Sequence, residues 1–134
     1  MRIRRAECAC GQLGVVVEGE PVRVSACHCL ACQKRTGSAF GVQARFSVDQ
    51  VRAFEGRSTV FTRTGDSGGR VTFHFCPACG TTVHYEVDGL PGFVVVAVGA
   101  FADPAFPGPT VSIYEERAHP WVGLLGSPGV EHLD

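Results

Sequence analysis

Seven cysteines are the residues of this 134-residue chain whose type and spacing suit chemistry. They form a C-x-C pair, a C-x-C-x-x-C triplet and a C-x-x-C pair: Cys8 and Cys10; Cys27, Cys29 and Cys32; Cys76 and Cys79. Two pairs can supply the four thiolates of a closed tetrahedral zinc site, whereas the triplet supplies three and leaves one position open. The cysteines therefore predict one zinc that holds the fold and one that does chemistry.

The two pairs are the candidates for the structural zinc, and each is followed by a glycine. Glycine lets backbone N–H groups approach a thiolate without a Cβ clash. The pairs lie far apart in the sequence, so a shared zinc would clip the first hairpin onto a late one. Two alternatives stay open: buried core cysteines, and an iron–sulfur cluster, although the triplet fits neither common iron–sulfur spacing.

The triplet is the candidate catalytic site. Zinc held by Cys27, Cys29 and Cys32 has a net charge of about −1 and should accept a soft fourth ligand such as an exogenous thiolate. The basic pair Lys34 and Arg35 follows directly, and these cations could bind the carboxylates of a small anionic thiol. A solvated basic turn is the alternative interpretation of this pair.

Three histidines lie close to the cysteines in the sequence. His28 stands between two ligands of the triplet and is expected to act beside the metal, as a proton-transfer or orienting group. His74 and His84 flank the C-x-x-C pair and could supply a fourth ligand or move a proton. The alternative is that both simply pack within a β-sheet.

The elements that must position these residues are short. Apolar, often β-branched segments alternate with glycine and proline, which predicts an all-β fold with antiparallel sheets. The continuously apolar run from Phe93 to Val98 is predicted to be a central strand buried on both faces. Val71–Phe75 should be a strand that ends at the C-x-x-C pair. Helix is expected only as short turns, over Cys29–Arg35 ending at Gly37 and over Ser47–Val51.

The composition limits the possible functions. Twelve basic and 13 acidic side chains give a net charge of −1, which argues against a nucleic-acid partner. The sequence has neither a secretory leader nor the roughly 20 apolar residues of a membrane span. Clustered thiols in a cytoplasmic protein favour metal over disulfides. We expect a single zinc-binding domain over residues 1–134, with a core at about 4–122 and a poorly ordered tail at 126–134.

Taken together, the motifs resemble those of the glutathione-dependent formaldehyde-activating enzyme family, to which centromere protein V also belongs. The resemblance rests on Cys8-x-Cys10-Gly, on Cys27-His-Cys29-x-x-Cys32 with the Lys-Arg-Thr-Gly that follows, and on Cys76-Pro-x-Cys79-Gly-Thr. It implies the β-tent fold and two Zn²⁺ per chain. It also implies that the two pairs hold the structural zinc and the triplet holds the catalytic one.

The resemblance further implies a carbon–sulfur lyase that acts on small thiol–aldehyde adducts similar to S-hydroxymethylglutathione. Two other hypotheses remain. The chain could be a zinc-stabilised protein-binding module without catalysis, or a thiol or metal sensor that uses the triplet reversibly. A fourth protein ligand at the triplet would favour the binding module, and an exchangeable ligand there would favour the enzyme.

Overall fold

The computed structural model describes residues 1–65, 68–123 and 129–134, and these residues are mostly β, as the sequence predicted. The strands are β1 (Ile3–Glu7), β2 (Gly14–Glu18), β3 (Arg23–Cys27), β4 (Gly41–Ser47), β5 (Val51–Glu55), β6 (Thr59–Thr64), β7 (Arg70–Phe75), β8 (Thr82–Val87), β9 (Phe93–Ala97), β10 (Val111–Ile113) and β11 (Glu131–His132). Helical structure is limited to α1 (Leu30–Thr36) and three single 3₁₀ turns: η1 (Val48–Gln50), η2 (Val98–Phe101) and η3 (Glu115–Arg117).

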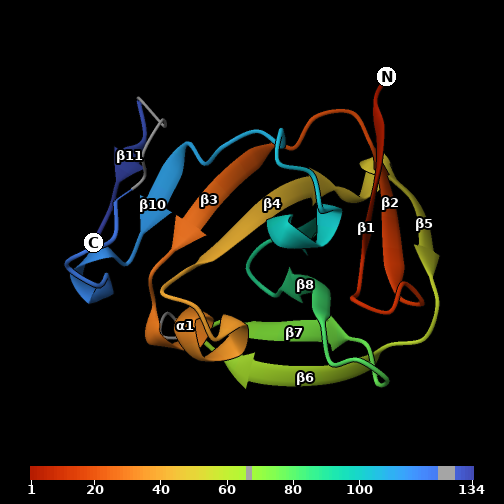
Figure 1. Cartoon of the computed structure of the whole chain (residues 1–134), viewed down its shortest axis with the longest axis horizontal. Helices are drawn as coiled ribbons and strands as arrows, with labels where there is room; N and C mark the ends of the chain where they lie inside the picture. Colours follow the sequence, from red (N-terminus) through yellow and green to blue (C-terminus); the bar gives the residue numbers. More distant parts are fainter. Residues whose placement is uncertain (66–67, 124–128) are drawn as a thin grey trace.

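The strands form two sheets. The smaller has the order β1-β2-β5, and the larger has the order β11-β10-β3-β4-β9-β8-β7-β6. Figure 1 shows the small sheet standing at one side, while the large sheet bends so that β3 and β4 run above and β6 and β7 run below. The bend brings α1, β6 and β10 around one cavity, although β6 and β10 lie near opposite ends of the large sheet.

Strand β9 is the predicted central strand. It pairs antiparallel with both β4 and β8, and its three middle valines are buried. Val94 and Val96 belong to the main core, whereas Val95 belongs to a second cluster on the opposite face. A continuously apolar run is therefore needed here, because each face of the strand covers a different core.

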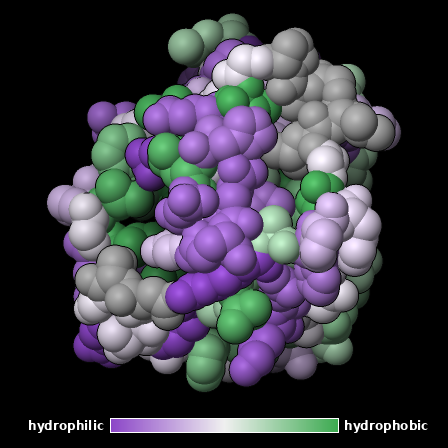
Figure 2. Space-filling view, turned by 90° about the vertical axis from the view of Figure 1, so that its left-hand side faces the viewer, coloured by the Kyte–Doolittle hydropathy of each residue, from purple (hydrophilic) through white to green (hydrophobic). Residues whose placement is uncertain are grey.

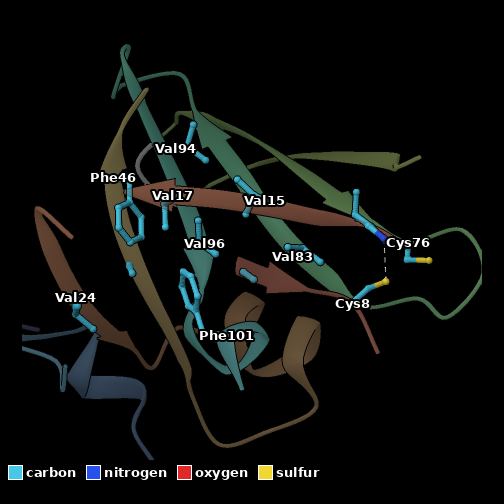
Figure 3. Packing of buried hydrophobic residues seen from close by; sticks show 13 residues of the cluster. Cys8, Val15, Val17, Val24, Phe46, Cys76, Val83, Val94, Val96 and Phe101 are labelled. Atoms are coloured by element: carbon cyan, nitrogen blue, oxygen red, sulfur yellow. Dashed lines mark hydrogen bonds between the residues drawn. The ribbon is translucent and has the colours of Figure 1, made fainter. Parts of the chain in front are cut away.

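The main core lies between the two sheets. Val15 and Val17 of the small sheet pack with Phe46 and Val96 of the large one, all essentially inaccessible to solvent. Figure 3 shows that Cys8 and Cys76 lie at one end of this cluster. A metal held there would therefore extend the apolar core and join β1 to β7.

Two strand pairs differ from the predicted antiparallel arrangement. Strand β10 pairs in parallel with β3 and with β11. Parallel pairing needs a long connection, and most of the chain separates β3 from β10. The tail was expected to be poorly ordered. Residues 126–128 lie outside the described residues, but β11 forms within the tail and pairs with β10.

The predicted helical turns are confirmed. The side chain of Cys29 caps the N-terminus of α1, and Gly37 ends this helix at a φ of 66°, in the left-handed region that favours glycine. Ser47 and Gln50 form a reciprocal capping box around η1. In the described part of the chain, no helix has the length and apolar character needed to cross a membrane.

Candidate metal centres and active site

The two cysteine pairs converge, as predicted. The Cys10 Sγ atom lies 3.6 Å from that of Cys8 and 3.7 Å from that of Cys76, and all four sulfurs, Cys79 included, lie within 4.8 Å of one another. Tetrahedral zinc with Zn–S bonds of about 2.3 Å requires sulfurs about 3.8 Å apart. The donor set and its spacing therefore fit a metal ion such as zinc.

Hydrogen bonds prepare these sulfurs to carry negative charge. The backbone N–H of Leu13 donates to Cys8 Sγ at 3.2 Å, and that of Ala78 donates to Cys76 Sγ at 3.3 Å. Gln12 Nε2 also donates to Cys76 Sγ, at 3.0 Å. Hydrogen bonds from Thr81, first from its side chain, lower the pKa of Cys79 to about 5. Such contacts favour thiolates over thiols.

The triplet forms a second, separate group. Cys27 ends β3, Cys29 caps α1 and Cys32 lies in its first turn. All three are buried, and their sulfurs lie within 4.8 Å of one another. The backbone N–H of Cys32 donates to Cys29 Sγ at 3.3 Å. The tight turn from strand to helix therefore gathers three thiols with no contribution from a distant segment.

The charge within the triplet is unevenly distributed. A hydrogen bond from Cys27, helped by the nearby Arg35 guanidinium, lowers the pKa of Cys32 to about 5. The same hydrogen bond, together with burial, raises the pKa of Cys27. The surroundings therefore favour a thiolate at Cys32 over one at Cys27. A metal ion would replace the proton of this hydrogen bond and let all three sulfurs ionise.

A cavity of about 210 Å³ opens directly onto the triplet. All three cysteines line it, and its opposite wall is formed by Phe73 and Tyr85, which come from the lower limb of the bent sheet. Within the described residues, the group of metal-ligating side chains around this cavity holds three members and no fourth. The arrangement leaves space for a small molecule beside the sulfurs.

The two basic residues after the triplet differ in where their side chains lie. The Arg35 guanidinium turns inward: its Cζ lies 5.2 Å from the ring centroid of Phe73 and 5.4 Å from that of Tyr85. Its Nη2 lies 3.9 Å from Cys32 Sγ. Lys34 is exposed and lines a neighbouring, largely apolar cavity of about 310 Å³. Arg35, rather than Lys34, is therefore the cation next to the thiols.

Two residues at this site were missed by sequence reasoning. Tyr85 lines the cavity, and burial raises the pKa of its hydroxyl, which stays protonated. Arg63 lines both this cavity and its apolar neighbour, with its Cζ 5.5 Å from the Phe73 ring. Neither lies near a cysteine in the sequence. Only the bend of the large sheet brings β6 and β8 to the triplet.

His28 is not among the side chains that could hold a metal at the triplet. Its Nε2 donates to Ser112 Oγ at 2.9 Å, and Ser112 donates in turn to Glu115 at 2.9 Å. The ring is buried, which lowers the pKa of His28, and its Nδ1 has no partner within the described residues. The side chain fastens the end of β3 to β10 and so supports the triplet from behind.

His74 and His84 do not approach either cysteine group as a further ligand. Each group of metal-ligating side chains in the described residues is separate, and the two histidines belong to a third group with Glu86. His84 is buried against the Phe54 ring, at 5.0 Å between centroids. Burial, followed by repulsion from His74, lowers the pKa of His84 to about 4.

The surface gives a further constraint. Figure 2 shows the face at the left of Figure 1, where a band of hydrophilic residues separates small groups of hydrophobic ones. Large contiguous apolar patches mark protein-binding sites. The described residues on this face form none, so this face does not favour the binding-module hypothesis.

The comparisons with known proteins agree with this geometry. A family model described as glutathione-dependent formaldehyde-activating enzyme matches residues 3–117. The chain is also similar to a Rhodobacter sphaeroides protein whose crystal structure is known, with 22% identity and a TM-score of 0.58, over 75% of this chain and 91% of that one. At this identity the likeness shows the fold alone. Among curated proteins no relative matches.

Proposed function

Because the chain belongs to the glutathione-dependent formaldehyde-activating enzyme family, we propose that it is a zinc-dependent carbon–sulfur lyase. Its substrates are small adducts of a thiol and an aldehyde, similar to S-hydroxymethylglutathione. The observation that carries the proposal is the cavity of about 210 Å³ whose wall contains all three cysteines of the triplet. A purely structural metal site has no need of such a cavity, because its ligand shell is closed.

We assign two Zn²⁺ to each chain. Cys8, Cys10, Cys76 and Cys79 hold the structural ion, and Cys27, Cys29 and Cys32 hold the catalytic one. Zinc bound by three thiolates supplies an open position for a soft donor such as the substrate sulfur, and it lowers the pKa of a thiol there. The buried thiolates suit a reducing compartment, so we place the activity in the cytoplasm.

The reaction couples a proton transfer to the breaking of the carbon–sulfur bond. In the cleavage direction, the hydroxyl group of the adduct loses its proton, its oxygen forms the carbonyl double bond, and the electrons of the carbon–sulfur bond pass to sulfur, which takes up the proton. The products are the aldehyde and the free thiol. Tyr85, whose hydroxyl stays protonated, is placed to donate a hydrogen bond to the oxygen as negative charge develops on it.

Substrate binding is assigned to the cations around the triplet cavity and the apolar cavity beside it. Arg63 lines both cavities, whereas Arg35 and Lys34 line the apolar one. Arg35 lies beside Cys32 and stacks on the Phe73 and Tyr85 rings. A planar guanidinium held in this way can bind a carboxylate through two parallel hydrogen bonds. Arg63 lies at the junction with the apolar cavity, and Lys34 lines that cavity from the exposed side. The substrate is therefore an anionic thiol with room for an apolar portion.

The direct test is exchange NMR on a mixture of formaldehyde, glutathione and their adduct. Wild-type protein should accelerate exchange between adduct and free components, and Cys32→Ser should not. The Ser variant keeps the fold, because it removes a ligand from a locally formed turn. Zinc content and a circular dichroism spectrum of the variant serve as controls. Absence of acceleration by the zinc-loaded wild type would reject the lyase and favour the binding module.

A sensor function has a different signature. Mild peroxide should release zinc from a sensor, with reversible formation of a disulfide among the triplet cysteines. Retention of zinc under mild peroxide would favour the enzyme over the sensor.

A further inference from the structure

We propose that His74, His84 and Glu86 form a third metal site, which binds a divalent transition metal ion of the Zn²⁺ class. The site lies on β7 and β8, outside both cysteine groups. It does not depend on the lyase activity, because none of its side chains lines the cavity at the triplet.

The register of the sheet places the three side chains together. His74 and His84 are directly opposite each other in the antiparallel pair of β7 and β8. Their rings stack, with centroids 4.5 Å apart and planes 17° apart. Glu86 lies two residues after His84 on the same strand, and alternate residues of a strand share a face. All the candidate ligand atoms lie within 4.8 Å of one another.

The pairing of β7 and β8 becomes irregular next to His74 and His84. The pairing slips between His74 and Phe75, so that Val83 is the extra residue on β8. Such bulges re-aim side chains and occur next to functional sites. Val83 fills the main core, while His84 lies at the edge of that core against Phe54.

The contacts of His74 are those of a metal-ligating histidine. Its Nδ1 lies 3.2 Å from Ser58 Oγ, and its Nε2 lies 2.8 Å from the Glu86 carboxylate. A hydroxyl can donate or accept. When Ser58 accepts a hydrogen bond from Nδ1–H, the lone pair of Nε2 is free for a metal, and Ser58 orients the ring as an outer partner. The Glu86 carboxylate, which contacts the same Nε2 atom, is then the third ligand.

His84 supplies the second nitrogen. Only 6% of this residue is exposed, yet its ring nitrogens form no hydrogen bond within the described part of the chain. The ring borders a cavity of about 410 Å³ that Phe54, Ser58, His74 and Glu86 also line. The ring nitrogens of His84 are not among the buried atoms that lack a partner, so they keep contact with the cavity, and an ion that enters it can reach them.

The charge around the site favours a cation. The described lining of this cavity contains Glu86 but no lysine or arginine. Two imidazoles and one carboxylate form a ligand set of intermediate softness, which suits zinc and its neighbours rather than magnesium or calcium. Three protein ligands leave at least one position for water, and the adjoining cavity gives access to it. The two rings are stacked with their planes 17° apart, so metal binding requires them to turn until their in-plane lone pairs meet at one ion.

The experiment titrates Zn²⁺ into protein whose cysteine groups are already zinc-loaded, as verified by the failure of a thiol reagent to modify the thiols. Isothermal calorimetry should detect one further equivalent. Long-range ¹H–¹⁵N spectra of the imidazole rings should show the nitrogens of His74 and His84 shifting with that equivalent. Glu86→Gln and His84→Gln should each weaken this binding at least tenfold.

His132→Gln is the matched control, because His132 also contacts a glutamate but lies outside the cluster. It should bind the further equivalent as the wild type does. The proposal is rejected if no further equivalent binds, or if other histidines shift instead of His74 and His84. Full affinity in both cluster variants would reject it as well. Should His84→Gln fail to fold, the half-exposed Glu86 still provides the decisive variant.

Discussion

The guanidinium of Arg35 and the thiolate of Cys32 lie one helical turn apart on α1, with Nη2 3.9 Å from Sγ. The cation is held in place by the rings of Phe73 and Tyr85. It is therefore close enough to stabilise the thiolate, and it also lines the apolar cavity of about 310 Å³ beside the triplet. Lys34, its neighbour in the sequence, is exposed.

This difference predicts separate effects of the two cations. Arg35→Gln should lower kcat/KM for glutathione by about 10- to 100-fold, the range expected when a hydrogen bond to a charged group is lost. The loss should be smaller for 2-mercaptoethanol, which has no carboxylate. Lys34→Gln should change kcat/KM for glutathione and for 2-mercaptoethanol by less than threefold. Equal losses for both thiols would contradict carboxylate binding, provided that zinc content is unchanged.

The two cysteine groups should respond differently to loss of one ligand. Cys79→Ser removes a link between distant strands, so the melting temperature should fall by on the order of 10 °C or more, or the chain should aggregate. Cys32→Ser disturbs only a local turn, so the protein should stay folded, lose one zinc and lose activity. Thermal melts with metal analysis measure both. Similar melting of the two variants would make the triplet structural.

Metal content provides a third prediction. Protein purified under reducing conditions should retain two Zn²⁺ per chain after dialysis, because the cysteine groups provide four and three thiolates. The proposed His74–His84–Glu86 site should lose its metal in the same dialysis, since it has fewer and weaker ligands. Mass spectrometry on protein of known concentration gives the ratio. A reproducible value of one or zero, without oxidised thiols, would contradict the two-zinc assignment.

Gly56 supports the four-cysteine group indirectly. Its φ is 81°, and an added Cβ would overlap the backbone oxygen of Gln12, the residue whose side chain donates to Cys76 Sγ. Gly56→Ala should therefore destabilise the fold by about 2 kcal/mol or more, since strain and a clash add. Gly92→Ala has a similar φ of 83° but no nearby atom, so it should cost about 1 kcal/mol. Denaturant unfolding distinguishes them.

His84 should make stability depend on pH. Its pKa in the folded state is about 4, below the ordinary value of about 6.5 in the unfolded chain. The unfolded state therefore binds the proton first as the pH falls, so stability is full above about pH 6.5 and declines toward pH 4. The decline should amount to at most about 3 kcal/mol. The His84→Gln variant should lack this loss of stability between pH 6.5 and pH 4, whereas the His132→Gln variant should show it as the wild type does. Parallel urea titrations at pH 7 and pH 5 measure the difference.

The sequence by itself determined the features that depend on local chemistry. Thiol spacing predicted which cysteines group together, because a C-x-x-C turn and a C-x-C extended segment bring their own sulfurs close. The apolar run from Phe93 to Val98 predicted a strand buried on both faces, although the strand ends at Ala97 and Val98 begins η2. Gly37 predicted the end of α1, because only glycine adopts its φ without cost.

The tertiary structure decided which residues line the cavity together with the triplet cysteines. The bend of the large sheet places Tyr85 and Arg63 opposite the triplet, although 53 residues separate Tyr85 from Cys32. Arg35 and Lys34, adjacent in the sequence, lie on different sides of α1, and the register of β7 and β8 places His84 opposite His74. These relationships depend on sheet curvature and register, which arise from packing over the whole chain and leave no mark in local spacing.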